Sequence, residues 1–296
     1  MTMSGFLEVE SPGLFTTVQD LGRYGFAHLG VSAAGAADPM ALRIGNLLVG
    51  NDESEAALEC TFRGPSIRFS ERSVVAVTGA HSAKWVPVTV EAGEHISVTG
   101  EWSGARCYLA VRGGLDVPLR LGSRSTHVLS GLGGFEGRSL RRGDRIGVAS
   151  RAFGEPRLEG IGWPLARRSV LRVTAGPQAD WFGDEFYSFT YEVREDSDRM
   201  GIRLAGRPLE AAHAGVSITE GASLGAVQVP PGGEPIVLFV DHQTTGGYPK
   251  IANVISADLW RLGQLRPRDK VRFELVSMDQ ALDALRRQER ILESLR

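Results

Sequence analysis

The stretch that decides the fold runs from residue 72 to residue 114 and reads RSVVAVTGAHSAKWVPVTVEAGEHISVTGEWSGARCYLAVRGG. Short runs rich in valine, isoleucine and aromatic residues alternate here with glycine or polar turn pairs, which is typical of consecutive β-strands. The runs cover residues 74–78, 85–90, 95–99 and 106–111. We therefore predict that the first half of the chain is mostly sheet.

The second half repeats this texture, and the chain has 37 glycines among its 296 residues to supply tight turns. Its strand-like runs are residues 170–174, 189–194, 201–204, 226–229, 235–240 and 270–276. The chain is long enough for two domains. The sequence thus predicts a mainly β, β-rich α+β protein with a few short helices.

The domain boundary is placed where the strand pattern lapses. Glycine and proline recur every few residues in FGEPRLEGIGWPLARR, which ends at residue 168. We expect one domain at 1–151, a linker at 152–168 and a second domain at 169–296. A faint repeat supports tandem domains, because RRGDRI at 141–146 resembles RPRDKV at 266–271.

Three helices are legible against this background. The clearest has Asp38 as N-cap, Pro39 at its first position and Gly50 as its stop signal. A short helix is expected over 256–262. Ser277 and Gln280 form a predicted capping box for a last helix, which we expect to pack on the second domain. Its apolar line is Ala281, Leu285, Leu292 and Leu295.

Charge and hydropathy exclude several classes of partner. A formal net charge of −2 provides no broad positive field for nucleic acid. No apolar run approaches the roughly 20 residues that span a bilayer, and the first residues do not resemble a secretory signal. We therefore expect a cytoplasmic protein without membrane or nucleic-acid partners. Cys60 and Cys107 lie in apolar stretches and are interpreted as core residues.

Lysine is rare, which limits the possible cofactor chemistry. The three lysines are Lys84, Lys250 and Lys270, and none follows a glycine, so no P-loop is expected to bind ATP. None lies between methionines, so we expect no biotin attached to this chain. The six histidines show no metal-ligand spacing on a helix, and no metal site is expected.

Two polar, glycine-rich segments lie in the first half. The first, TTVQDLGRYG at 16–25, continues to an expected helix start; its candidates are Asp20, Arg23, Asp38 and Glu59. A helix start favours anions, but an ordered loop whose acids cap and whose arginine pairs explains the pattern equally well. The second contains Ser123 and Arg124 between glycines. It is suited to a carboxylate or phosphate, although crossing loops of a barrel are the favoured interpretation.

Two further segments lie in the second half. SDRMGIRL at 197–204 contains Arg199, which is suited to clamping a carboxylate, or alternatively belongs to a structural ion-pair cluster. GAVQVP at 225–230 is followed by DHQTTGGYPK at 241–250. An acid, amide and hydroxyl donors, paired glycines, a tyrosine and a lysine at a strand end favour a small-molecule site over a plain hairpin.

Together these segments identify a family. The chain resembles the carboxyltransferase domain, subdomains A and B, through six motifs that occur in order. They are TTVQDLGRYG, SAAGAADPMALRIGNLLVGN, VRGGLDVPLRLGSRST, SDRMGIRL, GAVQVPPGGEPIVL and DHQTTGGYPKI. One departure is visible in the last turn, where Arg268 replaces the glycine of the usual Pro-Gly-Asp; we expect it to affect turn geometry and not chemistry.

The resemblance implies two tandem cyclophilin-like β-barrel domains and a partner chain that carries subdomains C and D. It also implies a subunit of an ATP-dependent 5-oxoprolinase, which hydrolyses 5-oxoproline to glutamate together with that partner and a third barrel subunit. ATP would be shared with the partner.

Residue type and motif then suggest roles in such an enzyme. Asp241 and Lys250 are the catalytic candidates, Asp241 for ions or protons and Lys250 for phosphate. Arg199 would hold the substrate carboxylate, and the remaining substrate-binding candidates are Gln228, Gln243, Thr244, Thr245 and Tyr248. A possible second cluster comprises Asp20, Arg23, Asp38, Glu59, Ser123 and Arg124.

Two alternative functions remain open at the level of the sequence. The first is biotin-dependent carboxyl transfer to urea or a similar amide, as in the family's urea carboxylase members, with the biotin on another chain. The second is a non-catalytic regulatory binding role of the Kip-antagonist type, in which the chain sequesters a kinase inhibitor.

Overall fold

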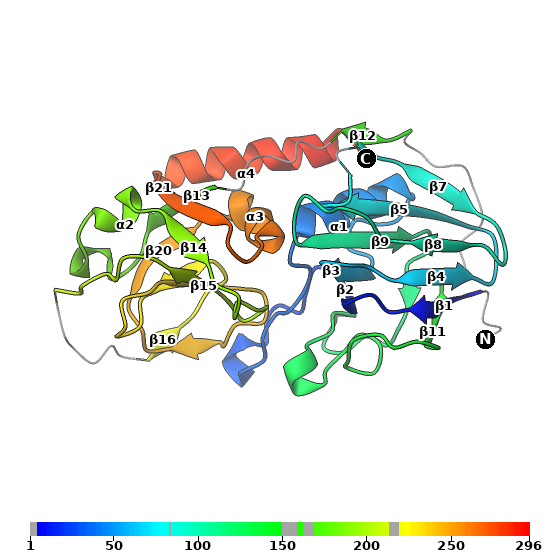
Figure 1. Ribbon diagram of the computed structural model, residues 1–296, viewed down its shortest axis with the longest axis horizontal. Coiled ribbons are helices and arrows are strands. Elements are labelled where there is room, and N and C mark those ends of the chain that lie inside the picture. The colour runs from blue at the N-terminus through cyan, green and yellow to red at the C-terminus, as the bar shows by residue number, and fades with distance from the viewer. Residues whose placement is uncertain (1–4, 83, 150–158, 163–168, 213–218) are drawn as a thin grey trace. The chain divides into compact units, whose positions relative to one another are not determined.

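The computed structural model describes residues 5–82, 84–149, 159–162, 169–212 and 219–296. The chain divides into two compact units, which are described separately (Figure 1). Unit 1 comprises Met1–Arg23, Ala34–Leu165 and Leu295–Arg296, and unit 2 comprises Tyr24–Ala33 and Ala166–Ser294. The grouping of Tyr24–Ala33 with unit 2 has no signal in the sequence.

Unit 1 contains two five-stranded antiparallel sheets. In order across the first sheet lie β10 (Leu115–Asp116), β11 (Arg145–Val148), β1 (Phe6–Ser11), β4 (Ser66–Phe69) and β8 (His95–Ser97). The second contains β2 (Phe15–Gln19), β3 (Ala57–Thr61), β9 (Arg106–Val111), β5 (Ser73–Gly79) and β7 (Pro87–Val90). A two-stranded sheet of β6 (Lys84–Trp85) and β12 (Ile161–Gly162) and the 3-10 turn η2 (Val128–Ser130) complete the unit.

The core of unit 1 lies between its two sheets. Leu7 and Ile67 from the first sheet and Leu58 and Leu109 from the second belong to one buried apolar cluster. Alternate residues of each strand supply this cluster, as expected for period-two patterning. Cys60 and Cys107 face each other on neighbouring strands, and both are free and fully buried, which confirms the core interpretation.

Helix α1 (Pro39–Leu48) covers the outer face of the second sheet. It begins as predicted, since Pro39 takes the first turn and the Asp38 carboxylate accepts a hydrogen bond from the Ala41 N–H at 2.9 Å. The Thr78 hydroxyl of β5 donates to the Ala41 carbonyl at 2.6 Å. A Cβ at Gly45 would lie 3.0 Å from that hydroxyl oxygen, so glycine permits the close approach of helix and sheet.

The turn before β11 contains an ion pair that gives unit 1 a pH-dependent stability. Asp144 accepts 2.7 Å hydrogen bonds from Arg138 Nη1 and from the Arg141 N–H. Hydrogen bonding to Arg138 lowers the pKa of Asp144 below its ordinary value, with a smaller contribution from the Arg141 N–H. The carboxylate therefore stabilises the fold above the unfolded-state pKa of about 3.9, and this contribution is lost as the pH falls through the lower folded-state pKa.

We expect Asp144→Asn to lower the free energy of unfolding by about 1–2 kcal/mol at pH 7, because the hydrogen bonds lose their ionic acceptor. Urea titrations from pH 7 down to about pH 3 should show the difference from wild type shrinking as Asp144 is protonated. Glu136→Gln is the control, since Glu136 binds the same arginine but is 65% exposed. A difference that stayed constant across this pH range would contradict the explanation.

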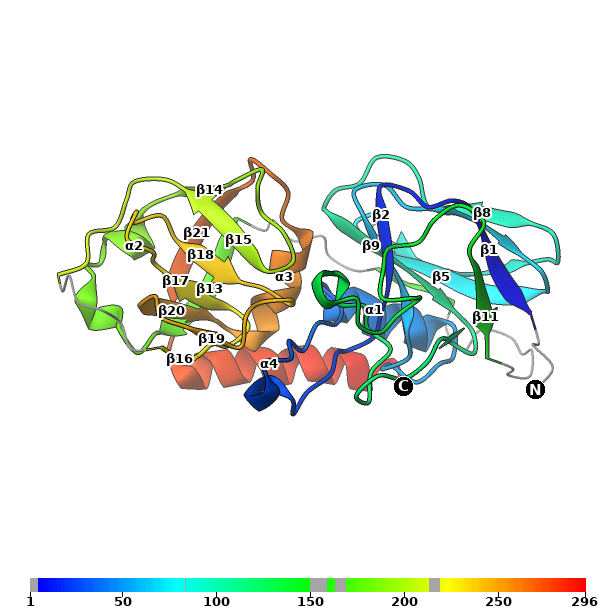
Figure 2. The same ribbon diagram turned by 90° about the horizontal axis from the view of Figure 1, so that it is seen from below.

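Unit 2 is built on a closed seven-stranded barrel. In order around it lie β13 (Val170–Ala175), β20 (Lys250–Val254), β17 (Ala226–Gln228), β18 (Ile236–Leu238), β15 (Gly201–Ala205), β14 (Tyr191–Val193) and β21 (Lys270–Leu275). Parallel pairing of β13 with β21 closes the barrel, and its other strand pairs are antiparallel. A ribbon of β16 (Glu220–Gly221) and β19 (Thr245–Gly246) lies beside β17 and β20 (Figure 2).

Helices and 3-10 turns complete unit 2. They are η1 (Ala27–Leu29), η3 (Ala179–Trp181), α2 (Glu185–Ser188), η4 (Ser256–Asp258), α3 (Leu259–Gln264) and α4 (Met278–Glu293). Phe186 of α2 stacks on Phe273 of β21 with ring centroids 4.5 Å apart. The predicted capping box of Ser277 and Gln280 is present at the start of α4.

Helix α4 packs on unit 2, as predicted. It buries Ala281, Ala284 and Leu292, while Leu285 is only partly buried. The predicted apolar line is thus correct at Ala281 and Leu292, and the structure adds Ala284, whose small side chain allows close contact with the loop around Ile255 and Ala257.

The last barrel turn contains the one departure from the family pattern. Arg268 has a φ of 71°, the left-handed conformation that glycine adopts without strain. Its N–H donates to the Val193 carbonyl at 2.7 Å, and its guanidinium pairs with the exposed Glu195. The arginine therefore preserves the turn at the cost of some backbone strain.

The strand content and the closed barrel confirm the predicted β-rich barrel fold. In unit 1 the strands form two facing sheets. The predicted linker at 152–168 lies outside the described residues except for 159–162. Among the described residues, no helix is long and apolar enough to cross a bilayer, and no group of three metal-binding side chains meets.

Candidate functional site

Asp20 ties the end of β2 to the loop at residues 123–126. Its carboxylate accepts hydrogen bonds from the Gly22 N–H (2.8 Å), the Ser123 hydroxyl (2.6 Å), the Ser125 hydroxyl (2.5 Å) and the Arg124 N–H (2.5 Å). The Asp20 N–H donates to Ser125 Oγ at 2.9 Å. These hydrogen bonds satisfy the carboxylate, and only 8% of Asp20 is exposed, so Asp20 has a structural role. We call Asp20 and its partners at residues 22 and 123–125 the latch.

Arg23 extends this latch. It is 2% exposed, and its Nη2 donates to the Ser125 carbonyl. A Cβ on Gly133 would lie 2.7 Å from this Nη2 and 2.2 Å from the Ser125 carbonyl oxygen, so the position requires glycine. Arg124 turns away and donates through Nε to the Val117 carbonyl at 3.2 Å. The structure therefore brings Asp20, Arg23, Ser123 and the Arg124 backbone together in one latch.

Glu59 and Asp38 form a separate buried group on the α1 face of the second sheet. The Tyr108 hydroxyl donates to Glu59 Oε2 at 2.6 Å and accepts from the Asp38 N–H at 2.7 Å. Glu59 Oε2 also accepts from the Ala37 N–H at 2.8 Å. Burial, and then the Glu59 carboxylate, raise the pKa of Tyr108. These contacts fix the start of α1 on the sheet, as the ordered-loop interpretation proposes.

Gln19 joins the same face of the second sheet to the loop at 123–126. Its Nε2 donates at 3.0 Å to Thr17 Oγ1 and at 3.0 Å to the Thr126 carbonyl. Polar side chains of the TTVQD motif are therefore hydrogen-bonded to one another and to the loop at 123–126.

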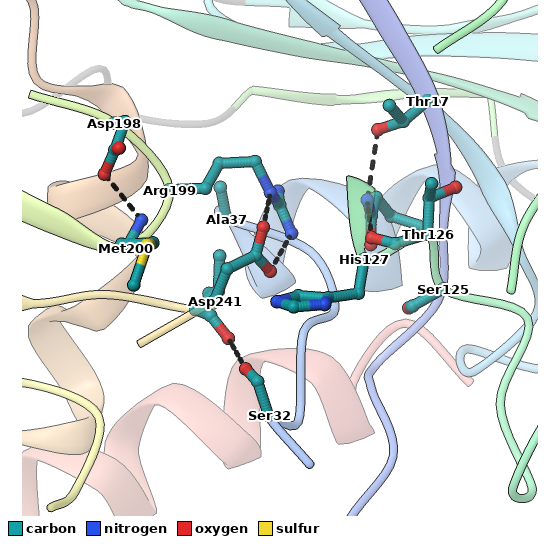
Figure 3. Close-up of polar contacts among 12 residues, drawn as sticks. Thr17, Ser32, Ala37, Ser125, Thr126, His127, Asp198, Arg199, Met200 and Asp241 are labelled. Carbon is teal, nitrogen blue, oxygen red and sulfur yellow. Dashed lines mark hydrogen bonds and ion pairs between the residues drawn. The ribbon is translucent and has the colours of Figure 1, made fainter. Parts of the chain in front are cut away.

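In unit 2, Arg199 and Asp241 form a bidentate ion pair (Figure 3). Arg199 Nε lies 2.8 Å from Asp241 Oδ2, and Nη2 lies 3.0 Å from Oδ1. The Asp241 N–H donates to the Arg199 carbonyl at 2.8 Å, and the two side chains are only 10% and 9% exposed. Arg199 thus clamps a carboxylate of its own chain, that of Asp241, 42 residues away, as in the ion-pair alternative. Its role toward a substrate stays a prediction.

Lys250 begins β20 and is almost completely buried. Its Nζ lies 2.6 Å from Glu220 Oε1 of the ribbon, and its side chain is 7% exposed. Gln178, which follows β13, donates through Nε2 to the same Glu220 oxygen at 3.1 Å. The Oε1 atom of Gln178 accepts a hydrogen bond from the Lys250 N–H at 2.9 Å. The structure therefore assembles Lys250, Glu220 and Gln178 from three separate segments.

Gln228 and Gln243 meet beside this group. Gln243 Nε2 lies 3.4 Å from Gln228 Oε1, and Gln228 is 2% exposed. Gln228 Nε2 is buried and finds no hydrogen-bond acceptor within the described parts of the chain. A Cβ on Gly246 would lie 2.8 Å from that nitrogen, so a glycine lets the ribbon pass over it. A buried amide donor without a partner is rare in folded proteins and calls for an explanation, such as a bound water or ion or a catalytic role.

The remaining predicted residues are more open to solvent. Gln243 and Thr245 are exposed, Thr244 is half-buried, and Tyr248 is 46% exposed. The Thr244 carbonyl accepts from the Ala222 N–H at 2.9 Å, which holds the ribbon together. His242 lies beside them, and burial lowers its pKa. A ligand role for these residues stays a prediction.

Sequence reasoning missed Glu220 and Gln178. Glu220 follows a stretch that resembles no motif, and Gln178 stands alone in a turn after a strand. No local pattern marks either residue, because each becomes a neighbour of Lys250 only through folding. The one available signal was the rarity of lysine, since a buried lysine needs a carboxylate nearby.

Each unit also has a hollow that none of the predicted site residues lines. The hollow in unit 1 measures about 470 Å³ and is bordered by the glycine-rich segment 131–137 and by Arg120. The hollow in unit 2 measures about 520 Å³ and is bordered by Trp181, Phe182 and Phe189. Several of the predicted residues instead form hydrogen bonds with one another, as in the Asp20–Ser123, Arg199–Asp241 and Gln228–Gln243 pairs.

The chain matches one family model and resembles two proteins of the same name along nearly its whole length. The family model for the carboxyltransferase domain, subdomain A and B, matches residues 29–275. The C subunit of the 5-oxoprolinase from Escherichia coli is 38% identical over 98% of this chain and 97% of that protein. The protein of the same name from Haemophilus influenzae is 38% identical over 99% and 98% of the two chains.

A solved structure extends the comparison to a larger protein. The crystal structure of the Kluyveromyces lactis urea amidolyase matches with a TM-score of 0.90 at 31% identity. The match covers 98% of this chain but only 20% of that chain. The fold described above is therefore also found as about a fifth of the urea amidolyase chain.

Proposed function

Because this chain belongs to the family of the carboxyltransferase domain, subdomains A and B, we propose that it is the C subunit of an ATP-dependent 5-oxoprolinase. One observation carries the proposal: the alignment with two proteins of that name at 38% identity, over nearly the whole of both partners. The enzyme would be a hydrolase that is active only as a complex.

The reaction consumes 5-oxoproline, ATP and water and yields glutamate, ADP and phosphate. The ring amide resists hydrolysis because resonance makes its carbonyl carbon a weak electrophile and because the nitrogen is a poor leaving group. Phosphorylation of the amide oxygen activates the carbon, after which water adds, the carbon–nitrogen bond breaks and phosphate leaves. The protein's contribution to such chemistry is mainly positioning and neutralisation of negative charge.

The polar groups of unit 2 fit parts of this task. The Arg199–Asp241 ion pair would lie beside the substrate, where Arg199 would attract its carboxylate and Asp241 would assist ions or protons. The spare Nε2 donor of Gln228 would bind the amide oxygen, with Gln243 supporting it. Lys250 would neutralise charge on the transferred phosphoryl group. The more open Thr244, Thr245 and Tyr248 would line the approach to these groups.

The fit to ATP is partial. Lys250 and Gln228 offer one cation and one spare donor, which suit a single phosphoryl group but not a whole nucleotide. We therefore propose that ATP binds at a site completed by a partner chain that carries subdomains C and D. A third subunit would take part in ring opening, and the complex would work in the cytoplasm. The latch around Asp20 and the group around Glu59 support the fold of unit 1.

Carboxyl transfer is the second candidate, because the urea amidolyase match has a TM-score of 0.90. Two assays of the purified complex of this chain with its partner subunits distinguish the two candidate functions. One assay supplies 5-oxoproline and ATP, and the other supplies urea, ATP and bicarbonate. We expect glutamate and phosphate from the first mixture, no product from the second, and no effect of avidin on the first. Turnover of urea that avidin blocks would instead establish biotin-dependent carboxyl transfer.

A further inference from the structure

Lys250 differs from the other two lysines in its surroundings. Its side chain is 7% exposed, whereas that of Lys270 is 63% exposed and Lys84 is also exposed. Transferring an ammonium group out of water is costly unless a counter-charge and hydrogen bonds compensate. A buried lysine is therefore expected only where neighbouring groups compensate for this cost.

Glu220 supplies the counter-charge. Its Oε1 lies 2.6 Å from Lys250 Nζ and accepts Gln178 Nε2 at 3.1 Å. The hydrogen bond from Lys250, and then that from Gln178, lower the pKa of Glu220, so the carboxylate is ionised at neutral pH. Its side chain is 40% exposed, so the ribbon presents this carboxylate at the edge of the buried group.

Gln178 holds the other end of Lys250. Its Oε1 accepts from the Lys250 N–H at 2.9 Å, and its own N–H donates to the Lys250 carbonyl at 3.1 Å. One residue therefore fixes both backbone polar groups of Lys250 and, through Nε2, the carboxylate that binds the ammonium. These contacts restrict the position of the Lys250 backbone and, through Glu220, that of its ammonium group.

Lys250 lies next to Gln228, whose side-chain amide has a donor without a partner. Gln228 and Lys250 are register partners across β17 and β20. The buried Gln228 Nε2 has no acceptor within the described residues, and the only side-chain contact recorded for its Oε1 is Gln243. The register thus places a lysine and a glutamine with a spare donor side by side on neighbouring barrel strands, an arrangement suited to an anionic oxygen.

We propose that Glu220 and Gln178 are positioning residues, which hold the Lys250 ammonium beside Gln228 so that the two can bind one anionic oxygen of the activated amide. This inference rests on the proposed function. Neither residue needs to touch the substrate. Their effect on turnover passes through the position of Lys250.

The test measures Lys250 directly, because the chain has only three lysines. The wild-type complex and the Glu220→Gln variant are treated with an amine-acylating reagent, and the labelling rate of each lysine is followed by peptide mass spectrometry. We expect the Lys250 rate to rise about tenfold in the variant, as for loss of one charge-assisted hydrogen bond. The rates of Lys84 and Lys270 should stay unchanged.

A matched control exists in the Lys270–Glu192 pair, whose Nζ and Oε2 lie 2.5 Å apart on the exposed surface. Glu192→Gln should barely change the labelling of Lys270 or the turnover of 5-oxoproline. Gln178→Ala provides a second variant should Glu220→Gln fail to fold, and it should also speed labelling of Lys250. Melting temperatures establish that each variant is folded.

Turnover completes the test. Glu220→Gln should lower kcat about tenfold with little change in KM for 5-oxoproline, and Glu220→Asp should recover part of the loss because it keeps the charge. Unchanged Lys250 labelling would overturn the inference, and so would faster labelling with an unchanged kcat. An inactive wild-type complex would refute the proposed function instead, while the labelling result would still decide whether Glu220 positions Lys250.

Discussion

Replacing Lys250 with methionine should lower the turnover of 5-oxoproline by the complex by roughly 10²- to 10³-fold, the usual effect of removing one preorganised charge-stabilising group. Lys250 is the only lysine with a buried side chain among the three of this chain. Neither Lys84 nor Lys270 occupies this buried position, so we expect neither lysine to replace it. Release of phosphate and glutamate from 5-oxoproline and ATP measures the effect.

The same substitution should leave the fold intact. Methionine has a similar length and fills the buried position, and Glu220, with 40% of its side chain exposed, can be hydrated once its partner is gone. Lys270→Met is the control, because it also removes a lysine from an ion pair, but at the surface. Turnover by Lys250→Met within a few-fold of wild type would show that the ammonium takes no part in the reaction.

Asp20→Ala should produce the largest loss of stability in unit 1. The substitution leaves four donors without their acceptor, among them the Gly22 and Arg124 N–H groups. Each buried unsatisfied donor costs about 1–3 kcal/mol, and partial relaxation of the loop reduces the sum, so we expect a loss of about 3–5 kcal/mol. Calorimetry should show a melting temperature lower by roughly 10 °C.

Asp52→Ala is the matched control for this prediction. Asp52 is also an aspartate in a loop of unit 1 that accepts hydrogen bonds, here from the Ser54 N–H and hydroxyl, but it is exposed to solvent. Water can replace its contacts, so the change should cost less than about 1 kcal/mol. If both alanine variants melted at the same temperature, the latch would not be the source of stability that its contacts suggest.

Local chemistry made parts of the fold predictable. The start of helix α1 is marked by Asp38 as a cap and Pro39 in its first turn, and the start of α4 by the box of Ser277 and Gln280. These signals lie within a few residues of the structure that they specify. The insertion of Tyr24–Ala33 into unit 2 has no such signal, because it depends on contacts such as that of the Ser32 hydroxyl with the Val240 carbonyl.

The site was predictable only in its residue types. Arginine and aspartate in separate motifs suggested ligand binding, yet the carboxylate that Arg199 holds is Asp241 of the same chain. The sequence showed the polar groups around Asp20 but not that neighbouring donors satisfy its carboxylate. A sequence lists hydrogen-bonding groups, whereas folding decides which of them are already paired.

The central claim is that this chain is required for the ATP-driven opening of 5-oxoproline. The most direct test measures glutamate formed and ATP consumed by the purified partner subunits with and without this chain. We predict one glutamate for each ATP when the chain is present, and no glutamate above background when it is omitted. Equal glutamate production without the chain would contradict the account.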